Sequence, residues 1–188
     1  MSNSLRGQFL LSARKLRDSN FFKTVVLMVE HGDDGAMGLV VNRPSSVTVQ
    51  RALSGHFEMP ETNELVYIGG PVESAALFVV HNSSDLDTTE KPVVPGVYVG
   101  GSAAAFESVV RAATTGEGDL RCRIICGCAG WAPNQLEGEI ARGDWHLHPA
   151  DGEAVFTDDP YALWDNLIRQ VAEAHRVVRE GPKNAEWN

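Results

Sequence analysis

The stretch from Ile124 to His148 constrains the fold most, because its pattern changes from strand to helix and back to strand within one short unit. Its sequence is I-I-C-G-C-A-G-W-A-P-N-Q-L-E-G-E-I-A-R-G-D-W-H-L-H. The residues up to Cys128 alternate as in a strand, and Gly127 and Gly130 predict a turn. Pro133 suits the first position of the following helix, where its missing N–H leaves no bond unmade. We therefore expect a strand–turn–helix–strand unit, which is typical of the core of an α+β domain.

Two apolar segments near the N-terminus predict a β-hairpin. Thr24 to Glu30 is rich in β-branched residues, Ala36 to Val41 follows it, and residues 31–35 between them have a turn composition. Elsewhere, strands precede, interrupt and follow the helices without a regular strand–helix alternation. The sequence therefore predicts a single α+β domain with a mixed, mostly antiparallel sheet and flanking helices, rather than a doubly wound parallel fold.

The C-terminal region predicts an amphipathic helix. Ala154 to Phe156 is interpreted as a short edge strand before it. Either Asp158 or Asp159 caps the helix, and Pro160 lies in its first turn. Apolar residues then recur at helical spacing: Leu163, Trp164, Leu167, Ile168 and Val171. We expect this apolar stripe to dock on the sheet.

The charge of the chain opposes some classes of partner. A net charge of −9 disfavours nonspecific binding to nucleic acid, which needs a basic face. Five basic residues nevertheless cluster early in the chain: Arg6, Arg14, Lys15, Arg17 and Lys23. We interpret this uneven distribution of charge along the chain as a solvated surface, and the alternative of a local basic patch stays open. The longest apolar run, Val25 to Val29, is far too short to span a membrane, so no membrane partner is expected.

The thiols all fall in one predicted strand. Cys122, Cys126 and Cys128 cannot all pair with one another, so we expect reduced thiols and a cytoplasmic protein. Alternation places them on one strand face, and His146 and His148 share a face of a later strand. This spacing along a single strand suits a zinc site poorly, because zinc knuckles place their cysteines on turns. We therefore expect buried thiols, no metal and no other cofactor.

The chain contains five segments whose order and spacing are informative together: G-Q-F-L-L-S, T-V-V-L-M-V-E-H, G-A-M-G-L-V-V-N-R-P, G-G-P-V and G-W-A-P-N-Q-L-E-G-E-I-A-R-G-D-W. Between Gly7 and Val171 the chain resembles the YqgE/AlgH family of bacterial proteins on these segments. The resemblance implies a compact α+β fold with a strongly bent, coiled sheet. It implies no settled activity and no catalytic residues, although the AlgH name attaches a regulatory role in transcription to some members. We expect one domain over residues 1–179 and a flexible tail at residues 180–188.

Five polar residues form a candidate ligand-binding set. His31 and Asn42 lie at opposite ends of the predicted hairpin, and Arg43 could offer its guanidinium to an anionic ligand. Gln135 and Glu137 lie in the first turn of the predicted central helix. If these side chains converge in one cleft, they define a binding site. In the alternative interpretation, Asn42 caps a turn and His31 ties down a loop through backbone hydrogen bonds.

The function expected from these observations is that of a non-enzymatic regulatory or interaction domain with an unknown protein or small-molecule partner. One alternative is a thiol-dependent or hydrolytic enzyme that uses Cys128 with Gln135 and His31, since Cys128 precedes a predicted helix N-terminus. Another is a DNA-binding transcriptional regulator, which the acidic charge and the lack of a helix-turn-helix pattern disfavour.

Overall fold

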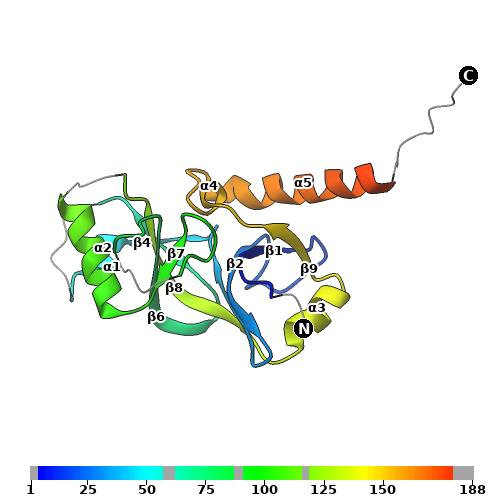
Figure 1. The fold of residues 1–188 in the computed structure, drawn as a ribbon, viewed down its shortest axis with the longest axis horizontal. Helices are drawn as coiled ribbons and strands as arrows, with labels where there is room; N and C mark the ends of the chain where they lie inside the picture. Colours follow the sequence, from blue (N-terminus) through cyan, green and yellow to red (C-terminus); the bar gives the residue numbers. More distant parts are fainter. Residues whose placement is uncertain (1–3, 57–61, 87–90, 116–118, 180–188) are drawn as a thin grey trace, which may run out of the picture.

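The computed structural model describes residues 4–56, 62–86, 91–115 and 119–179, and Figure 1 shows their arrangement. The strands of this part are β1 (Gln8–Ser12), β2 (Val25–Gly32), β3 (Gly35–Val40), β4 (Pro44–Thr48), β5 (Leu65–Ile68), β6 (Val72–His81), β7 (Tyr98–Gly100), β8 (Cys122–Trp131) and β9 (Trp145–Pro149). The helices are α1 (Val49–Leu53), α2 (Ala103–Thr115), α3 (Gln135–Ala141), α4 (Gly152–Val155) and α5 (Pro160–Arg179).

Strand β8 joins the two halves of a bent sheet (Figure 1). Its first half pairs in parallel with β5 and antiparallel with β6, whereas its second half pairs antiparallel with β3. Gly127 lies between the halves at φ +74°, and a Cβ there would lie 2.7 Å from the carbonyl oxygen of Gly70. The prediction of a turn at Gly127 and Gly130 is therefore wrong. The strand continues through a local kink to Trp131, and glycine at the kink permits close backbone approach.

The kink also corrects the predicted alternation of the thiols. Cys122 and Cys126 pack with the apolar cluster on the α2 side of the sheet. Cys128 instead packs with Ile125 in the cluster beneath α5. A regular strand would place Cys126 and Cys128 on one face, so the kink at Gly127 shifts the alternation by one residue.

The predicted hairpin is confirmed as β2 and β3, with Leu27 opposite Leu39. Asp33 and Asp34 form its turn. On the other side of β2, β1 pairs antiparallel with it and then with β9, so that β9 ends this half of the sheet. The order of strands along the bent sheet is β4-β5-β8-β3-β2-β1-β9. The hairpin thus lies at the centre of the half that carries α5.

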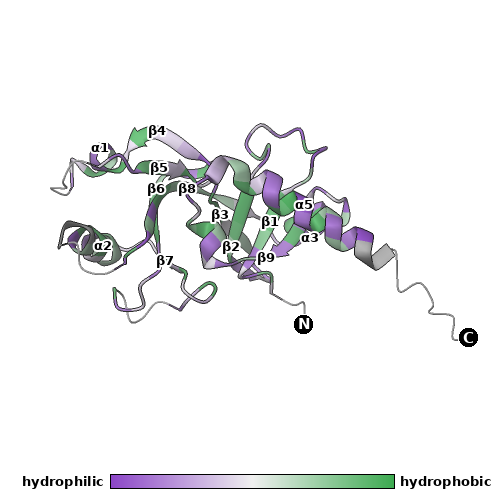
Figure 2. Cartoon of the chain, turned by 90° about the horizontal axis from the view of Figure 1, so that it is seen from above, coloured by the Kyte–Doolittle hydropathy of each residue, from purple (hydrophilic) through white to green (hydrophobic). Residues whose placement is uncertain are grey.

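Three apolar clusters hold the helices on the sheet. Figure 2 shows α1 and α2 at one end of the molecule, and α3 and α5 toward the other end. Helix α2 packs on β5, β6 and β8, whereas α3 packs with β2, β3 and β9. The stripe predicted on α5 packs on buried residues of β1 and β2, among them Phe9, Leu11 and Val25. The predicted docking of the C-terminal helix on the sheet is therefore confirmed.

Helix α5 begins as the sequence indicates. The Asp159 side chain accepts a 3.0 Å hydrogen bond from the backbone N–H of Ala162, so Asp159 rather than Asp158 is the cap. Pro160 is the first helical residue, where a missing N–H costs nothing. The cap and the proline together fix the start of α5 at Pro160.

Two other predictions of local structure are wrong. Asp151 accepts a 2.8 Å hydrogen bond from the N–H of Ala154 and caps α4, so residues 154–156 do not form the predicted edge strand. Pro133 is not the first residue of α3, because Asn134 precedes that helix in a left-handed conformation at φ 61°. At residues 154–156 a capped helix outweighs the apolar pattern, and at Pro133 a left-handed residue separates the proline from the helix.

The single-domain α+β class with a bent, mixed and mostly antiparallel sheet is confirmed for the described residues. The tail predicted at residues 180–188 lies outside them. Among the described helices, none combines the length and the apolar character needed to cross a membrane.

Candidate binding groove

A groove of about 500 Å³ runs between α5, the segment after β1 and the start of β9. Its apolar floor consists of Ala13, Ile168, Val171 and Ala172. Its polar rim consists of Arg14, Lys15, His146, Arg169 and His175. A hollow of about 160 Å³ adjoins it, shares Ala13 and Arg14, and adds Phe22, Lys23 and Trp164. We call the two together the α5 groove.

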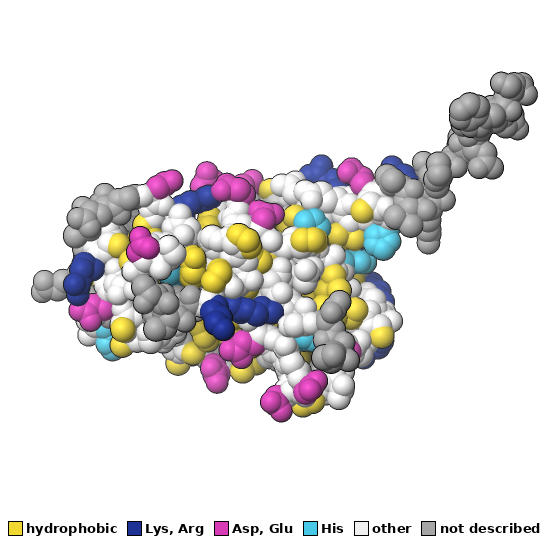
Figure 3. Space-filling view, viewed as in Figure 1, with side chains coloured by type: hydrophobic (Ala, Val, Ile, Leu, Met, Phe, Trp, Pro, Cys, Tyr) yellow, Lys and Arg dark blue, Asp and Glu magenta, His cyan; other side chains and the backbone are white. Residues whose placement is uncertain are grey.

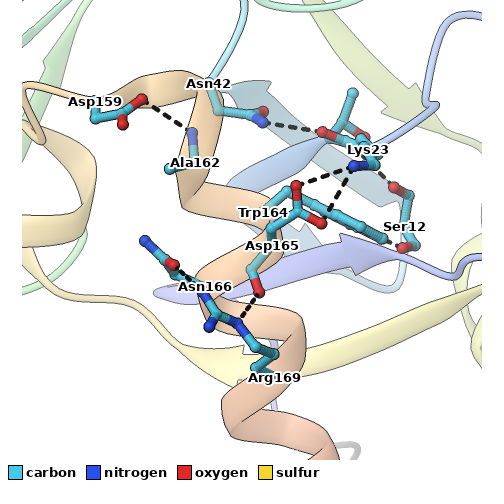
Figure 4. A network of polar contacts seen from close by, with 10 residues as sticks. Ser12, Lys23, Asn42, Asp159, Ala162, Trp164, Asp165, Asn166 and Arg169 are labelled. Atoms are coloured by element: carbon cyan, nitrogen blue, oxygen red, sulfur yellow. Dashed lines mark hydrogen bonds and ion pairs between the residues drawn. The ribbon is translucent and has the colours of Figure 1, made fainter.

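Trp164 anchors the helical wall of the α5 groove. Its indole N–H donates a 2.9 Å hydrogen bond to the backbone carbonyl of Ser12, at the end of β1. The Ser12 hydroxyl in turn accepts a 2.9 Å bond from the N–H of Thr24 (Figure 4). Both Ser12 and Trp164 are buried, so these bonds are shielded from water. They fix α5 against the sheet at one end of the groove.

Asn42 extends this buried network. Its Oδ1 accepts a 2.8 Å bond from the N–H of Val25, and its Nδ2 donates a 2.9 Å bond to the carbonyl of Lys23. The Lys23 side chain reaches Asp165 on α5 at 2.9 Å (Figure 4). Asn42 is only 8% exposed and uses its amide to hold the start of β2. This arrangement agrees with the turn-capping interpretation of Asn42.

Positive charge surrounds the α5 groove although the whole chain is acidic. Arg14 and Lys23 lie over the Trp164 ring at 5.4 and 5.1 Å from its centroid. Arg169 donates to the carbonyl of Asp165 and to the side chain of Asn166. Figure 3 shows histidine side chains gathered beside the C-terminal half of α5, with Lys and Arg side chains along the helix. Within the described ranges, neither Arg14 nor Arg169 forms an ion pair with a carboxylate.

Two acidic side chains compensate part of this charge. Asp144 lies 3.9 Å from the Lys15 ammonium and 3.1 Å from the Arg142 guanidinium. Asp165 pairs with Lys23 as described above. The cations that keep no carboxylate partner in the described structure, Arg14 and Arg169, both line the larger part of the groove.

The pKa of His146 reflects the burial and the positive charge of the groove. It lies on β9 and is half-buried. Burial lowers its pKa, and the nearby His175 and Lys15 lower the pKa of His146 further. Two of these three influences are neighbouring groups that carry, or can carry, positive charge. A bound anion would oppose them and favour the protonated ring.

The predicted ligand set does not converge in one cleft. His31 and Glu137 do meet, since His31 Nε2 lies 2.9 Å from Glu137 Oε1. The N–H of Leu5 donates to His31 Nδ1 at 3.2 Å, so the ring hydrogen lies on Nε2 and is donated to Glu137. Asn42 lies at the other end of the hairpin, where β2 begins. His31 therefore ties the N-terminal segment and α3 to the hairpin, away from Asn42.

Arg43 and Gln135 also bond within the protein. Arg43 donates to the carbonyls of the loop before β2, at Ser19, Asn20 and Phe22. Burial lowers the pKa of Arg43, and Asp18 partly offsets this effect. Gln135 accepts from the N–H of Ala132 at 3.1 Å. A ligand-binding role for the five residues stays a prediction, but they do not share a pocket.

Glu139 connects several elements through hydrogen bonds to its carboxylate, a role that the sequence did not predict. Its Oε2 accepts hydrogen bonds from the indole N–H groups of Trp131 (2.9 Å) and Trp145 (2.8 Å). Its Oε1 accepts from the Gln135 amide at 3.0 Å. One carboxylate thus joins the end of β8, α3 and the start of β9. The signal in the sequence is the pair of tryptophans on either side of an acidic helix.

The candidate nucleophile lies in the core. Cys128 is 3% exposed, and burial together with the nearby Glu73 raises the pKa of its thiol. Burial and Glu64 raise the pKa of Cys122 to about 11. A thiol with a raised pKa is a poor nucleophile at neutral pH, because the thiolate is the reactive form.

The bent mixed sheet, the buried polar anchors and the basic α5 groove define a single-domain α+β protein with a cationic groove along its C-terminal helix. The chain belongs to the AlgH-like family, whose sequence profile matches residues 9–176. A UPF0301 protein of Chlorobaculum tepidum is 32% identical over 94% of this chain and 92% of its own length. A UPF0301 protein of Myxococcus xanthus is 38% identical over 90% and 91%.

Solved structures share the fold. The solution structure of the AlgH protein from Pseudomonas aeruginosa is 29% identical, has a TM-score of 0.71, and is matched over 100% of this chain and 98% of that one. A crystal structure from Corynebacterium diphtheriae has the same TM-score of 0.71 at 23% identity, over 90% and 88% of the two chains. The family resemblance on the five sequence segments is thereby confirmed.

Proposed function

We propose that this protein is a non-enzymatic interaction domain of the cytoplasm and that the α5 groove is its binding surface. The observation that supports this proposal is the meeting of cations and histidines from three separate segments around one apolar hollow, in a chain of net charge −9. An apolar floor with a few convergent polar groups is the usual composition of a binding site. A regulatory role would follow from occupancy of this surface by a partner.

The thiol-dependent enzyme is the less favoured alternative. Cys128 is buried with a raised pKa, and its strand carries it into the core rather than into the α5 groove. The proposed partners of the enzyme alternative, His31 and Gln135, are engaged with Glu137 and Glu139 respectively. A nucleophilic mechanism needs a base beside the thiol, and these two side chains bond to carboxylates of α3 instead. The chain as a whole is acidic, which disfavours the DNA-binding alternative.

The test is to map bound probes on the protein by amide NMR, with a panel of small neutral and charged organic molecules. We expect the strongest binders to shift the signals of Ala13, Gly143 and Ala172. Ala172→Trp fills the floor and should abolish these shifts. Ala174→Trp, about 200° round the same helix, should leave them intact. Shifts confined to other surfaces would contradict the proposal, as would turnover of a hydrolase or thiol-transfer substrate that is lost in Cys128→Ala.

A further inference from the structure

We propose that the occupant of the α5 groove is a short acidic segment of a partner protein. In this proposal the segment lies extended along α5, with one apolar side chain on the floor and carboxylates on either side of it. The inference rests on the proposed function of the groove and adds the chemical class of the ligand.

The charges on the rim favour carboxylates. Arg14 is exposed and lies over the Trp164 ring, and Arg169 bonds to a carbonyl and an amide oxygen. Both guanidinium groups therefore retain N–H donors for a carboxylate, which they can bind in a planar, bidentate manner. His146 lines the same groove beside Lys15 and His175, and a bound carboxylate would offset the positive charge that these neighbours place near its ring. The rim is thus complementary to two or more negative charges.

The floor favours an apolar side chain between those charges. Ala13 and Ile168 line it together with Val171 and Ala172, and these residues leave a hollow of about 500 Å³. Phe22, which is 58% exposed, extends the apolar surface at the adjoining end. A free inorganic anion would contact the rim and leave this floor exposed. An apolar side chain removes the floor from water, which is favourable in proportion to the area covered.

The length of the groove fits an extended peptide. Its lining residues on α5 follow one face of the helix from Trp164 through Ile168 and Ala172 to His175. At about 1.5 Å per residue, this face is roughly 16 Å long. An extended chain of about five residues covers the same distance at roughly 3.3 Å per residue. A nucleic acid matches the rim less well, because its regular phosphates would also meet the acidic remainder of the surface.

The experiment is fluorescence anisotropy with labelled peptides and the full chain. The probe is Glu-Glu-Leu-Glu-Glu, compared with Gln-Gln-Leu-Gln-Gln and Glu-Glu-Ser-Glu-Glu. We expect the first peptide to bind at least ten times more tightly than either analogue, and more weakly at high salt. Arg14→Glu and Arg169→Glu should each weaken it at least tenfold. Arg51→Glu on α1 makes the same charge change far from the groove and should have no effect.

The outcomes separate this inference from the proposed function. Suppose that the neutral peptide binds as tightly as the acidic one and that Ala172→Trp blocks both. The groove is then a binding surface, but the proposal of an acidic ligand is overturned. If octanoate, inorganic phosphate or duplex DNA binds in the groove and the acidic peptide does not, the peptide assignment is likewise overturned. If the acidic peptide binds but Ala172→Trp has no effect on it, the groove itself is not the site. Thermal unfolding of each variant shows whether a loss of binding reflects a loss of fold, and Arg169→Gln repeats the test without a charge reversal.

Discussion

The indole N–H of Trp164 lies 2.9 Å from the carbonyl oxygen of Ser12, a residue 152 positions earlier in the chain. This bond connects α5, the helical wall of the groove, to the end of β1, where the opposite wall begins. Arg14 and Lys23 lie over the same indole ring, so the residue that anchors the helix also positions two cations of the rim. This buried contact therefore contributes to both the shape and the charge of the groove.

Replacing Trp164 with phenylalanine should destabilise the protein. The variant keeps an aromatic ring but removes the donor to the buried Ser12 carbonyl, at a cost of about 1–3 kcal/mol. Urea unfolding measures this difference. Tyr161→Phe is the matched control, because Tyr161 is 74% exposed on the same helix and its change should stay within ~0.5 kcal/mol. Equal stabilities for the two variants would contradict the anchoring role.

Gly127→Ala should destabilise the bent sheet, whereas Gly130→Ala on the same strand should not. Gly127 has φ +74°, and its new Cβ would lie 2.7 Å from the Gly70 carbonyl oxygen. The left-handed conformation alone costs a non-glycine residue roughly 1–3 kcal/mol. At Gly130 the nearest atom is 3.7 Å away, in the Val72 side chain. Thermal unfolding of the two variants compares the sites, and equal midpoints would show that the kink needs no glycine.

Cys128 should resist alkylation in the native protein. Its thiol is buried and its pKa is raised, so little thiolate is present or accessible at pH 8. Iodoacetamide labelling followed by peptide mass spectrometry gives the rate at each cysteine. The unfolded protein, in which all three thiols are exposed, is the control. Rapid native labelling at Cys128 would support the thiol-dependent enzyme instead.

His146 should make the protein less stable as the pH falls below about 6.5, the usual pKa of histidine. Burial and the neighbouring His175 and Lys15 lower the pKa of His146 in the folded state. The unfolded chain therefore binds more protons in this range, and stability is lost as the pH falls toward the folded pKa. Arg14, Lys15, Arg169 and His175 line the same groove, and Asp144 lies 3.9 Å from the Lys15 ammonium. His146→Gln should reduce this dependence, so that urea unfolding at pH 7.5 and 5.5 differs less than in wild type. An unchanged difference would contradict the assignment.

Features with a local cause were predictable from the sequence. The hairpin of β2 and β3 follows from two β-branched runs around a turn, and the start of α5 follows from Asp159 and Pro160. The apolar stripe of α5 also docks where its periodicity indicates. The sequence predicted a turn at Gly127 where the structure has a kinked strand. Glycine is common both in turns and where two backbones approach closely, so the residue type alone does not separate the two. Only the position of Gly70 distinguishes the two.

The α5 groove was not predictable in the same way. Arg14, His146 and Arg169 belong to segments far apart in the sequence, and only the pairing of β1 with β9 and the docking of α5 bring them together. The early cluster of basic residues indicated part of the groove, because Arg14, Lys15 and Lys23 line it. Two of the residues selected from the hairpin, His31 and Asn42, accept hydrogen bonds from backbone N–H groups at opposite ends of β2.

The most direct test of the account is paramagnetic broadening of amide NMR signals by a spin-labelled Glu-Glu-Leu-Glu-Glu peptide. It locates the bound acidic segment on the intact chain without any substitution. The account predicts broadening at Ala13, Gly143 and Ala172, and its loss when unlabelled peptide is added in excess. Broadening centred on α1 and α2, or none at millimolar peptide, would contradict it.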